Sequence, residues 1–112
     1  MKNIGILLRV DQFGKYKEMR DNIDIRFIHL FQRLNFLPIL IPTSISNIEL
    51  FINKMSLDGI ILSPGGDPLK QDIRKKNEFK IIKYCIKKKI PILGICRGAQ
   101  IINLYFKGKL KK

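Results

Sequence analysis

The sequence contains few of the residues that bind metals or form disulfide bridges. Its 112 residues include two cysteines, Cys85 and Cys96, and a single histidine. Two cysteines are too few for a disulfide framework, and one histidine leaves no cluster of metal ligands. The sequence therefore argues against a small disulfide-linked fold and against zinc chemistry, and we expect no metal site.

No apolar run in the sequence approaches the length of a membrane span. The first residues, MKNIGILLRVDQ, meet charge too early to form the apolar core of a secretory signal. We therefore expect a cytoplasmic protein that does not interact with membranes.

Acidic residues are scarce: nine Asp and Glu stand against 22 Lys and Arg, which gives a net charge of +13. Such an excess often indicates nucleic-acid binding. However, the sequence shows no helix-turn-helix spacing, no basic strand with interleaved aromatics and no Cys/His finger. We interpret the charge as solvated helix faces and a basic C-terminal stretch, and we expect no nucleic-acid partner. The lysines concerned are Lys75, Lys76, Lys80, Lys83, Lys87, Lys88, Lys89, Lys107, Lys109, Lys111 and Lys112.

The apolar residues that are present alternate between strand-like and helix-like spacing. The length and the 46% hydrophobic content fit one globular domain. This alternation predicts an α/β fold with an open parallel sheet and helices on both faces. Residues 9–24 show no clear periodicity. The predicted strands cover about residues 4–8, 36–42, 60–62 and 92–95, and helices cover about 23–34, 48–55, 72–88 and 99–106.

Residue spacing also predicts how the helices begin, end and pack. His29 falls off the apolar face of the first helix, so we interpret it as a surface residue rather than a general base. Ser46 with Glu49 is typical of a capping box at the start of the second helix, and Gly108 can cap the last one. The predicted buried faces are Ile23, Phe27, Leu30, Phe31 and Leu34 in the first helix, and Ile73, Phe79, Ile82, Cys85 and Ile86 in the third.

Cys96 lies where the last predicted strand meets the last helix, with Gly94 and Gly98 two residues away on either side. The pattern is that of a nucleophile elbow with cysteine in place of serine. Such a turn would present the sulfur at a helix N-terminus, which favours a thiolate, and the N–H of Arg97 would face an oxyanion. The glycine spacing alone leaves a second reading open, in which Cys96 is a small buried apolar residue.

A second glycine pair, Gly65 and Gly66, follows the third predicted strand in the stretch SPGGDP. Two glycines at the end of a strand permit positive φ values and close approach of a ligand to the backbone. Ligands of open α/β sheets bind at these strand ends, where Cys96 would also lie. Gly66 is therefore the natural second donor to an oxyanion, beside Arg97.

SPGGDP followed about thirty residues later by PILGICRGAQIIN resembles the class I glutamine amidotransferase-like family. The motif GICRGAQ is most similar to its gamma-glutamyl hydrolase branch, which acts on amides such as gamma-glutamyl-GABA. The segment YKEMRDNID resembles members that hydrolyse gamma-glutamyl-nucleotide amidates. The resemblance implies a flavodoxin-like three-layer α/β fold, with residues 1–112 forming the N-terminal part of one domain.

Carried over position by position, the resemblance makes Cys96 the nucleophile and Gly66 and Arg97 the backbone oxyanion donors. It implies that Gly65 and Gln100 lie against a small-molecule gamma-glutamyl amide substrate. The implied reaction forms a glutamyl thioester on the cysteine and then hydrolyses it. It implies no metal or organic cofactor.

The sequence departs from the family in its catalytic base. The family histidine and its carboxylate partner lie well downstream of the elbow, whereas this sequence ends at Lys112 and His29 does not match that position. Three hypotheses remain: an inactive N-terminal portion with an exposed sheet edge, one half of a split enzyme completed by a second chain, or a non-catalytic flavodoxin-like binding module. A response-regulator receiver is set aside, because Arg9 and Ser63 stand where that fold needs acidic residues.

Overall fold

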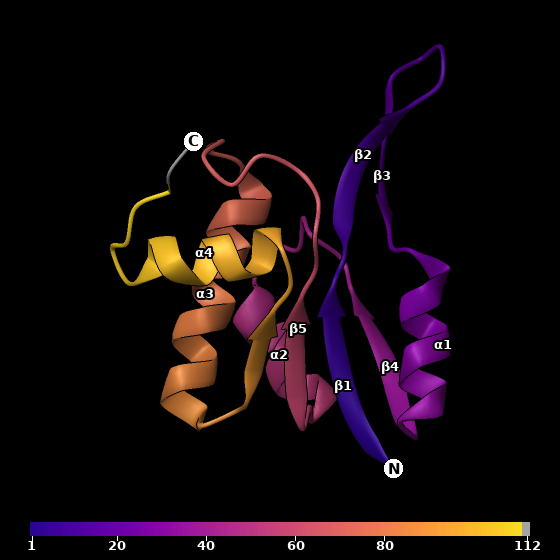
Figure 1. Cartoon of the computed structure of the whole chain (residues 1–112), viewed down its shortest axis with the longest axis vertical. Helices are drawn as coiled ribbons and strands as arrows, with labels where there is room; N and C mark the ends of the chain where they lie inside the picture. The colour runs from indigo at the N-terminus through magenta and orange to yellow at the C-terminus, as the bar shows by residue number, and fades with distance from the viewer. Residues whose placement is uncertain (111–112) are drawn as a thin grey trace.

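A parallel sheet of four strands, in the order β4-β1-β5-β6, forms the centre of the molecule (Figure 1). The structure is a computed structural model that describes residues 1–110. The apolar alternation predicts a helix after each sheet strand. This holds for β4, β5 and β6, whereas β2 and β3 intervene between β1 and α1. The sheet strands are β1 Lys2–Leu7, β4 Phe36–Ile41, β5 Gly59–Leu62 and β6 Ile92–Gly94, and the helices are α1 Ile25–Arg33, α2 Ile48–Met55, α3 Ile73–Lys88 and α4 Arg97–Tyr105.

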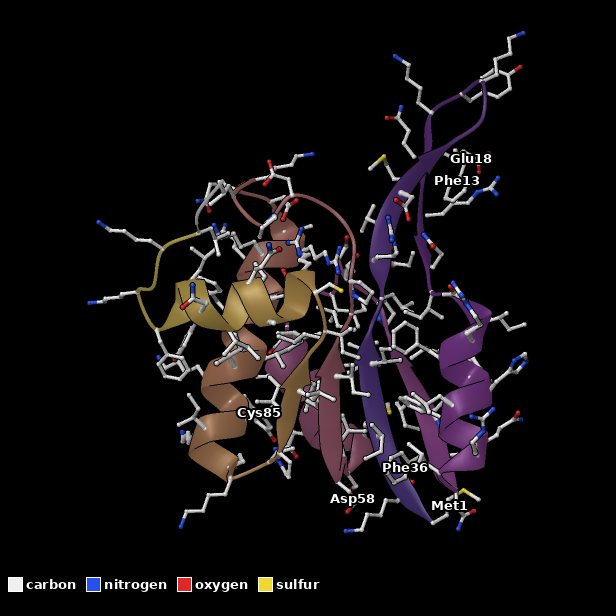
Figure 2. All side chains as sticks on the ribbon, viewed as in Figure 1. Met1, Phe13, Glu18, Phe36, Asp58 and Cys85 are labelled. Atoms are coloured by element: carbon white, nitrogen blue, oxygen red, sulfur yellow. The ribbon has the colours of Figure 1, made fainter. Side chains whose placement is uncertain are left out.

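Helices cover both faces of this sheet, which confirms the three-layer α/β fold. Alternate side chains of a strand point to opposite faces, so Ile6 and its neighbour Ile61 lie on one face with Phe31 of α1. Leu7 and Leu62 lie on the other face with α2, α3 and α4. The larger core comprises Leu7, Ile41, Ile48, Ile52, Ile60, Leu62, Ile81, Ile82, Cys85 and Ile101. Cys85 is thus a core residue, as predicted, and Figure 2 shows it on α3.

Residues 9–24, which show no periodicity in the sequence, contain an antiparallel hairpin of β2 (Arg9–Phe13) and β3 (Glu18–Asn22). The hairpin extends beyond the sheet, with Phe13 and Glu18 paired near its tip (Figures 1 and 2). Both faces of its outer part meet solvent, so no apolar alternation marks the strands. Its base is held to the domain where the Thr43 hydroxyl donates to Asp21 at 2.5 Å.

Two predicted helix caps are wrong by one residue. The side chain of Asn47, rather than Ser46, accepts a hydrogen bond from the N–H of Leu50 at 3.2 Å. At the end of α4, Lys107 takes the left-handed conformation with φ 64°, and Gly108 donates to the Asn103 carbonyl at 2.8 Å. This is the bonding of a Schellman motif, whose closing turn falls one residue earlier than the glycine suggests.

The buried faces of α1 and α3 also differ from the predicted ones. Leu30 and Leu34 of α1 are exposed, because α1 packs beside the edge strand β4 and covers only part of the sheet. In α3, Ile73 and Ile86 are exposed, while polar residues of the first half are buried. Asn77, for example, donates to the carbonyl groups of Thr43 and Ile45 at 2.7 and 3.0 Å, and thereby satisfies the loop that connects β4 to α2.

Within residues 1–110, none of the helices combines the length and apolar character that crossing a membrane requires.

Candidate active site

The strand-to-helix turn at residues 94–98, here called the elbow, holds Cys96 in a strained backbone conformation. Cys96 has φ 52° and ψ −107°, immediately before the first residue of α4, and its side chain is exposed. A non-glycine residue with such angles is uncommon and costs about 1–3 kcal/mol, so it persists only where surrounding contacts enforce it. The structure thus rejects the reading of Cys96 as a small buried apolar residue.

The glycines beside Cys96 contribute room rather than positive φ values. A Cβ on Gly98 would overlap the backbone of Leu62, and one on Gly94 would overlap the backbone of Gly98. Because both lack side chains, α4 starts directly against β5 and β6. The N–H of Ile95 donates to the Leu62 carbonyl at 3.1 Å and extends the pairing of these strands to the residue before Cys96.

The N-terminus of α4 leaves the N–H of Arg97, next to Cys96, without an acceptor in the helix. Gly98 donates to the Ile95 carbonyl at 2.9 Å, and Gln100 donates to the Cys96 carbonyl at 3.1 Å. Arg97 is the first residue of the helix, so its N–H has no acceptor within α4. Helix N-termini carry partial positive charge, which stabilises a nearby anion. Gln100 lies in the first turn with an exposed side chain.

Residues 63–68, here called the glycine loop, follow β5 and lie next to the elbow. Gly65 and Gly66 have φ values of 100° and 81°, which favour glycine, as the sequence predicts. A Cβ on Gly66 would lie 2.8 Å from Nη1 of Arg97, and one on Gly65 would overlap the guanidinium of Arg9. The loop is therefore packed between two arginines, one from β2 and one from the elbow.

Three charged residues, Arg74, Glu78 and Arg97, form a buried ion cluster beneath the glycine loop. Arg97 Nη2 donates to Glu78 Oε1 at 2.7 Å and Arg97 Nε donates to Oε2 at 3.2 Å. Arg74 Nε lies 3.6 Å from Glu78 Oε2. The side chains are 3–4% exposed for the arginines and 0% for Glu78. Burial lowers the pKa of Arg74 to about 10, so it remains charged at neutral pH.

Sequence reasoning missed this cluster, although one signal was present. Arg74 and Glu78 have the i,i+4 spacing that lets oppositely charged side chains meet on a helix. The many lysines of α3 suggest a solvated face, and nothing local distinguishes these two charges from the others. Their burial depends on Arg97, which lies 19 residues further along the chain.

A second ion pair orients the arginine on the outer side of the glycine loop. Arg9 donates from Nε and Nη2 to the two oxygens of Asp11 at 2.7 and 2.9 Å, and Asn22 donates to Asp11 at 2.8 Å. The hydrogen bonds from Arg9 and Asn22 lower the pKa of Asp11, and the Asp11 carboxylate raises the pKa of Arg9.

A cavity of about 520 Å³ lies between this hairpin and the glycine loop. It is lined by Val10, Met19, Ser44, Gly66, Asp67, Lys70, Asp72, Ile73, Arg74 and Arg97.

The structure brings most of the predicted site residues together and separates His29 from them. Cys96, Arg97 and Gln100 share the start of α4, and Arg97 reaches the glycine loop through its hydrogen bond to the Asp67 carbonyl at 3.1 Å. His29 is an exposed residue of α1, which packs beside β4, the sheet edge opposite β6 (Figure 1). Among residues 1–110, no three His, Cys, Asp or Glu side chains are grouped to hold a metal ion.

The fold and the elbow together define a class of protein, an α/β domain with a flavodoxin-like sheet and a cysteine at a strand-to-helix turn. Within that class the chain belongs to the class I glutamine amidotransferase family. The family's sequence profile, described as glutamine amidotransferase class-I, matches residues 14–112, which include both the glycine loop and the elbow.

Individual relatives are similar to this chain over different shares of its length, and they differ in what their names describe. The chain is 35% identical over 115 residues to the gamma-glutamyl-CDP-amidate hydrolase of Campylobacter jejuni, covering 92% of the chain and 54% of the relative. It is 34% identical over 93 residues to the GMP synthase [glutamine-hydrolyzing] of Plasmodium falciparum, covering 81% of the chain and 17% of the relative. For the carbamoyl phosphate synthase small chain of Gracilaria tenuistipitata, identity is 52% over 58 residues, or 51% of the chain and 14% of the relative. The chain thus spans about half or less of the length of these relatives.

Proposed function

We propose that this chain carries the nucleophile half of a thiol-dependent hydrolase of gamma-glutamyl amides, with Cys96 as the nucleophile. The observation that carries the proposal is the backbone of Cys96, at φ 52° and ψ −107° at the start of α4 with an exposed side chain. Strain of this kind at an exposed cysteine has no benefit for packing, and it accords with a role in chemistry.

In the proposed reaction the Cys96 thiolate attacks the γ-carbonyl carbon of the substrate. The carbonyl oxygen becomes an oxyanion that accepts hydrogen bonds from the backbone N–H groups of Arg97 and Gly66. The C–N bond then breaks, the amine leaves with a proton from a general acid, and a glutamyl thioester remains on the sulfur. Water hydrolyses this thioester and releases glutamate. Gly65 and Gln100 are proposed to lie against the glutamyl group.

The general base and acid of this reaction are proposed to come from outside residues 1–112, which we take as the N-terminal part of the domain. His29 cannot serve, since α1 lies at the opposite edge of the sheet. A histidine from a further segment or from a second chain would have to approach Cys96 to within hydrogen-bonding distance. Loss of a triad base typically costs several orders of magnitude in rate, so residues 1–112 alone are proposed to turn over substrate very slowly.

The leaving amine is proposed to carry a nucleotide. Support comes from the similarity to the gamma-glutamyl-CDP-amidate hydrolase, which covers 92% of this chain. The cavity between the hairpin and the glycine loop offers about 520 Å³ beside Gly66, with Arg74, Arg97 and Lys70 among its lining residues.

A chloroketone analogue of glutamine tests the nucleophile without requiring turnover. The thiolate of Cys96 would displace chloride and form an S–C bond, while the ketone oxygen occupies the oxyanion position. We expect the chloroketone to label Cys96 at least about tenfold faster than Cys85. We also expect Cys96 to prefer the chloroketone over iodoacetamide more strongly than a small free thiol does. Cys96→Ser removes the labelling, and Cys85→Ala leaves it intact. A preference of Cys96 for the chloroketone over iodoacetamide no larger than that of a small free thiol would instead favour a non-catalytic binding module.

A further inference from the structure

We propose that Arg74 is a positioning residue that locks the Gly65–Gly66 peptide in the orientation required of an oxyanion donor, with Glu78 and Arg97 holding Arg74 and the glycine loop in place. This inference rests on the proposed function of Gly66. It assigns a role in the site to two residues of α3, Arg74 and Glu78, which the motifs do not single out.

Arg74 binds the inner side of the glycine loop through several carbonyl groups. Its Nη1 donates to the Gly65 carbonyl at 2.7 Å, and its Nη2 donates to the Ser63 carbonyl at 3.1 Å and the Pro64 carbonyl at 3.4 Å. Nη2 also lies 3.3 Å from the Ser63 hydroxyl. A planar guanidinium with its donors in fixed directions can bind consecutive carbonyls in this way, whereas a lysine ammonium cannot reproduce the set.

The hydrogen bond to Gly65 determines where the N–H of Gly66 points. In a planar trans peptide, the C=O and the following N–H point in opposite directions. Since the Gly65 carbonyl faces Arg74 Nη1, the N–H of Gly66 is directed away from Arg74 and out of the buried ion cluster. The donor proposed for the oxyanion is therefore oriented by a side chain that lies on the opposite side of the peptide from the oxyanion.

The Gly65–Gly66 peptide has to be held in one orientation by other groups, because glycine stands on both sides of it. Flipping a peptide changes ψ of the first residue and φ of the second, and glycine tolerates both signs of φ. Gly65 and Gly66, at φ 100° and 81°, would allow a flip at little steric cost. Arg74 opposes the flip, because the reversed peptide would present an N–H to a cation and leave the guanidinium without its 2.7 Å acceptor.

Glu78 and Arg97 complete the arrangement from the other side. Glu78 is fully buried and accepts from Arg97 at 2.7 Å, while Arg97 Nη1 donates to the Asp67 carbonyl at 3.1 Å. The glycine loop is thus held at both ends, by Arg74 at Ser63 and Gly65 and by Arg97 at Asp67. Because Arg97 is also the first residue of α4, the same cluster connects the loop to the elbow.

The test compares Arg74→Lys and Arg74→Met with the unchanged chain, using Lys76→Met on the exposed side of α3 as a matched control. The main readout is the rate of Cys96 labelling by the glutamine chloroketone divided by its rate with iodoacetamide, which does not need the oxyanion donors. We expect this ratio to fall roughly 10–100-fold in Arg74→Met, with partial recovery in Arg74→Lys and no change in Lys76→Met. A merely structural role would lower both rates or neither. An unchanged ratio in folded Arg74→Met and Arg74→Lys would overturn the proposal.

The orientation of the Gly66 N–H bond, measured by NMR residual dipolar couplings, separates this proposal from the proposed function. If the unchanged chain shows no preference for the chloroketone, the hydrolase proposal fails while the positioning role of Arg74 can still be judged. A changed or averaged coupling at Gly66 in Arg74→Lys, but not in Lys76→Met, supports this role, and an unchanged coupling overturns it. Where Arg74→Met does not fold, the Lys variant decides alone, since it keeps a positive charge beside Glu78.

Discussion

Gly98 lies where α4 starts against the backbone of β5. Its φ is not among the positive values of the chain, but a Cβ would overlap the carbonyl of Leu62. The positive φ of the elbow belongs to Cys96 itself. The sequence pattern G-x-C-x-G thus correctly predicts a strand-to-helix turn. The structure shows that its glycines are required for close packing rather than for conformational freedom.

Gly98→Ala should therefore destabilise the chain. The added methyl group has to displace backbone rather than a mobile side chain, which typically costs about 1–3 kcal/mol. The matched change is Ala99→Ser, which adds one atom to the next residue on the exposed side of α4. Urea unfolding followed by circular dichroism measures both. Equal stability of the two variants would contradict the close packing of Gly98 against Leu62.

Cys85 illustrates how burial alone changes the acidity of a thiol. Its side chain lies in the larger core, and burial raises its pKa from 9.0 to about 11. The thiol therefore stays protonated near neutral pH and does not compete with Cys96 for electrophiles.

The raised pKa of Cys85 predicts a loss of stability at high pH. Between about pH 9 and 11 the unfolded chain releases the thiol proton while the folded chain retains it. Unfolding is thus favoured as pH rises, by roughly 2–3 kcal/mol once pH passes 11. Cys85→Ala should remove this part of the slope, whereas the lysines titrate alike in both proteins. Parallel curves of unfolding free energy between pH 8 and 11 would show that Cys85 does not titrate as described.

At the level of elements, α3 departs most from what periodicity predicts. Its apolar residues suggest that Ile73 and Ile86 face the core, yet both are exposed and Arg74, Asn77 and Glu78 are buried. The first half of α3 lies against carbonyl groups of the glycine loop and of residues 43–45, which need donors, so polar side chains are favoured there. Hydrophobic periodicity cannot detect a helix face that is buried against polar backbone.

Glu78→Gln tests how far the buried ion cluster stabilises α3 and the loop. Removing the carboxylate leaves Arg74 and Arg97 buried without their counter-charge, which typically costs about 3–5 kcal/mol. Glu49→Gln, an exposed change on α2, should have little effect. Thermal unfolding at moderate salt compares the two variants. A melting temperature for Glu78→Gln near that of Glu49→Gln would mean that the arginines are neutralised by other groups.

On the scale of the whole molecule, the two edges of the sheet differ. Strand β4 carries Pro38, which lacks an N–H, and α1 packs beside it. Strand β6 is the other edge within the described residues, and Leu93 in it is 57% exposed. Unprotected edge strands with apolar side chains pair readily with other chains. The proposed second half of the enzyme would have this edge available for pairing.

Self-association through β6 is therefore expected for the isolated chain. Leu93→Lys should reduce it, because a charge on an edge strand opposes pairing. Leu37→Lys, at an exposed position of β4, is the matched control and should leave association unchanged. Sedimentation velocity over a range of concentrations distinguishes the variants. Association that survives Leu93→Lys would place the contact elsewhere on the surface.

The sequence by itself determined the parallel α/β layout, the turn at Cys96 and the glycine pair at 65 and 66. Each of these depends on apolar periodicity or on the spacing of glycine, both of which act locally along the chain. Only the tertiary structure decided the hairpin at residues 9–22 and the buried ion cluster beneath the glycine loop. The hairpin lacks a buried face, and Glu78 and Arg97 pair across 19 residues, so no local pattern could reveal either.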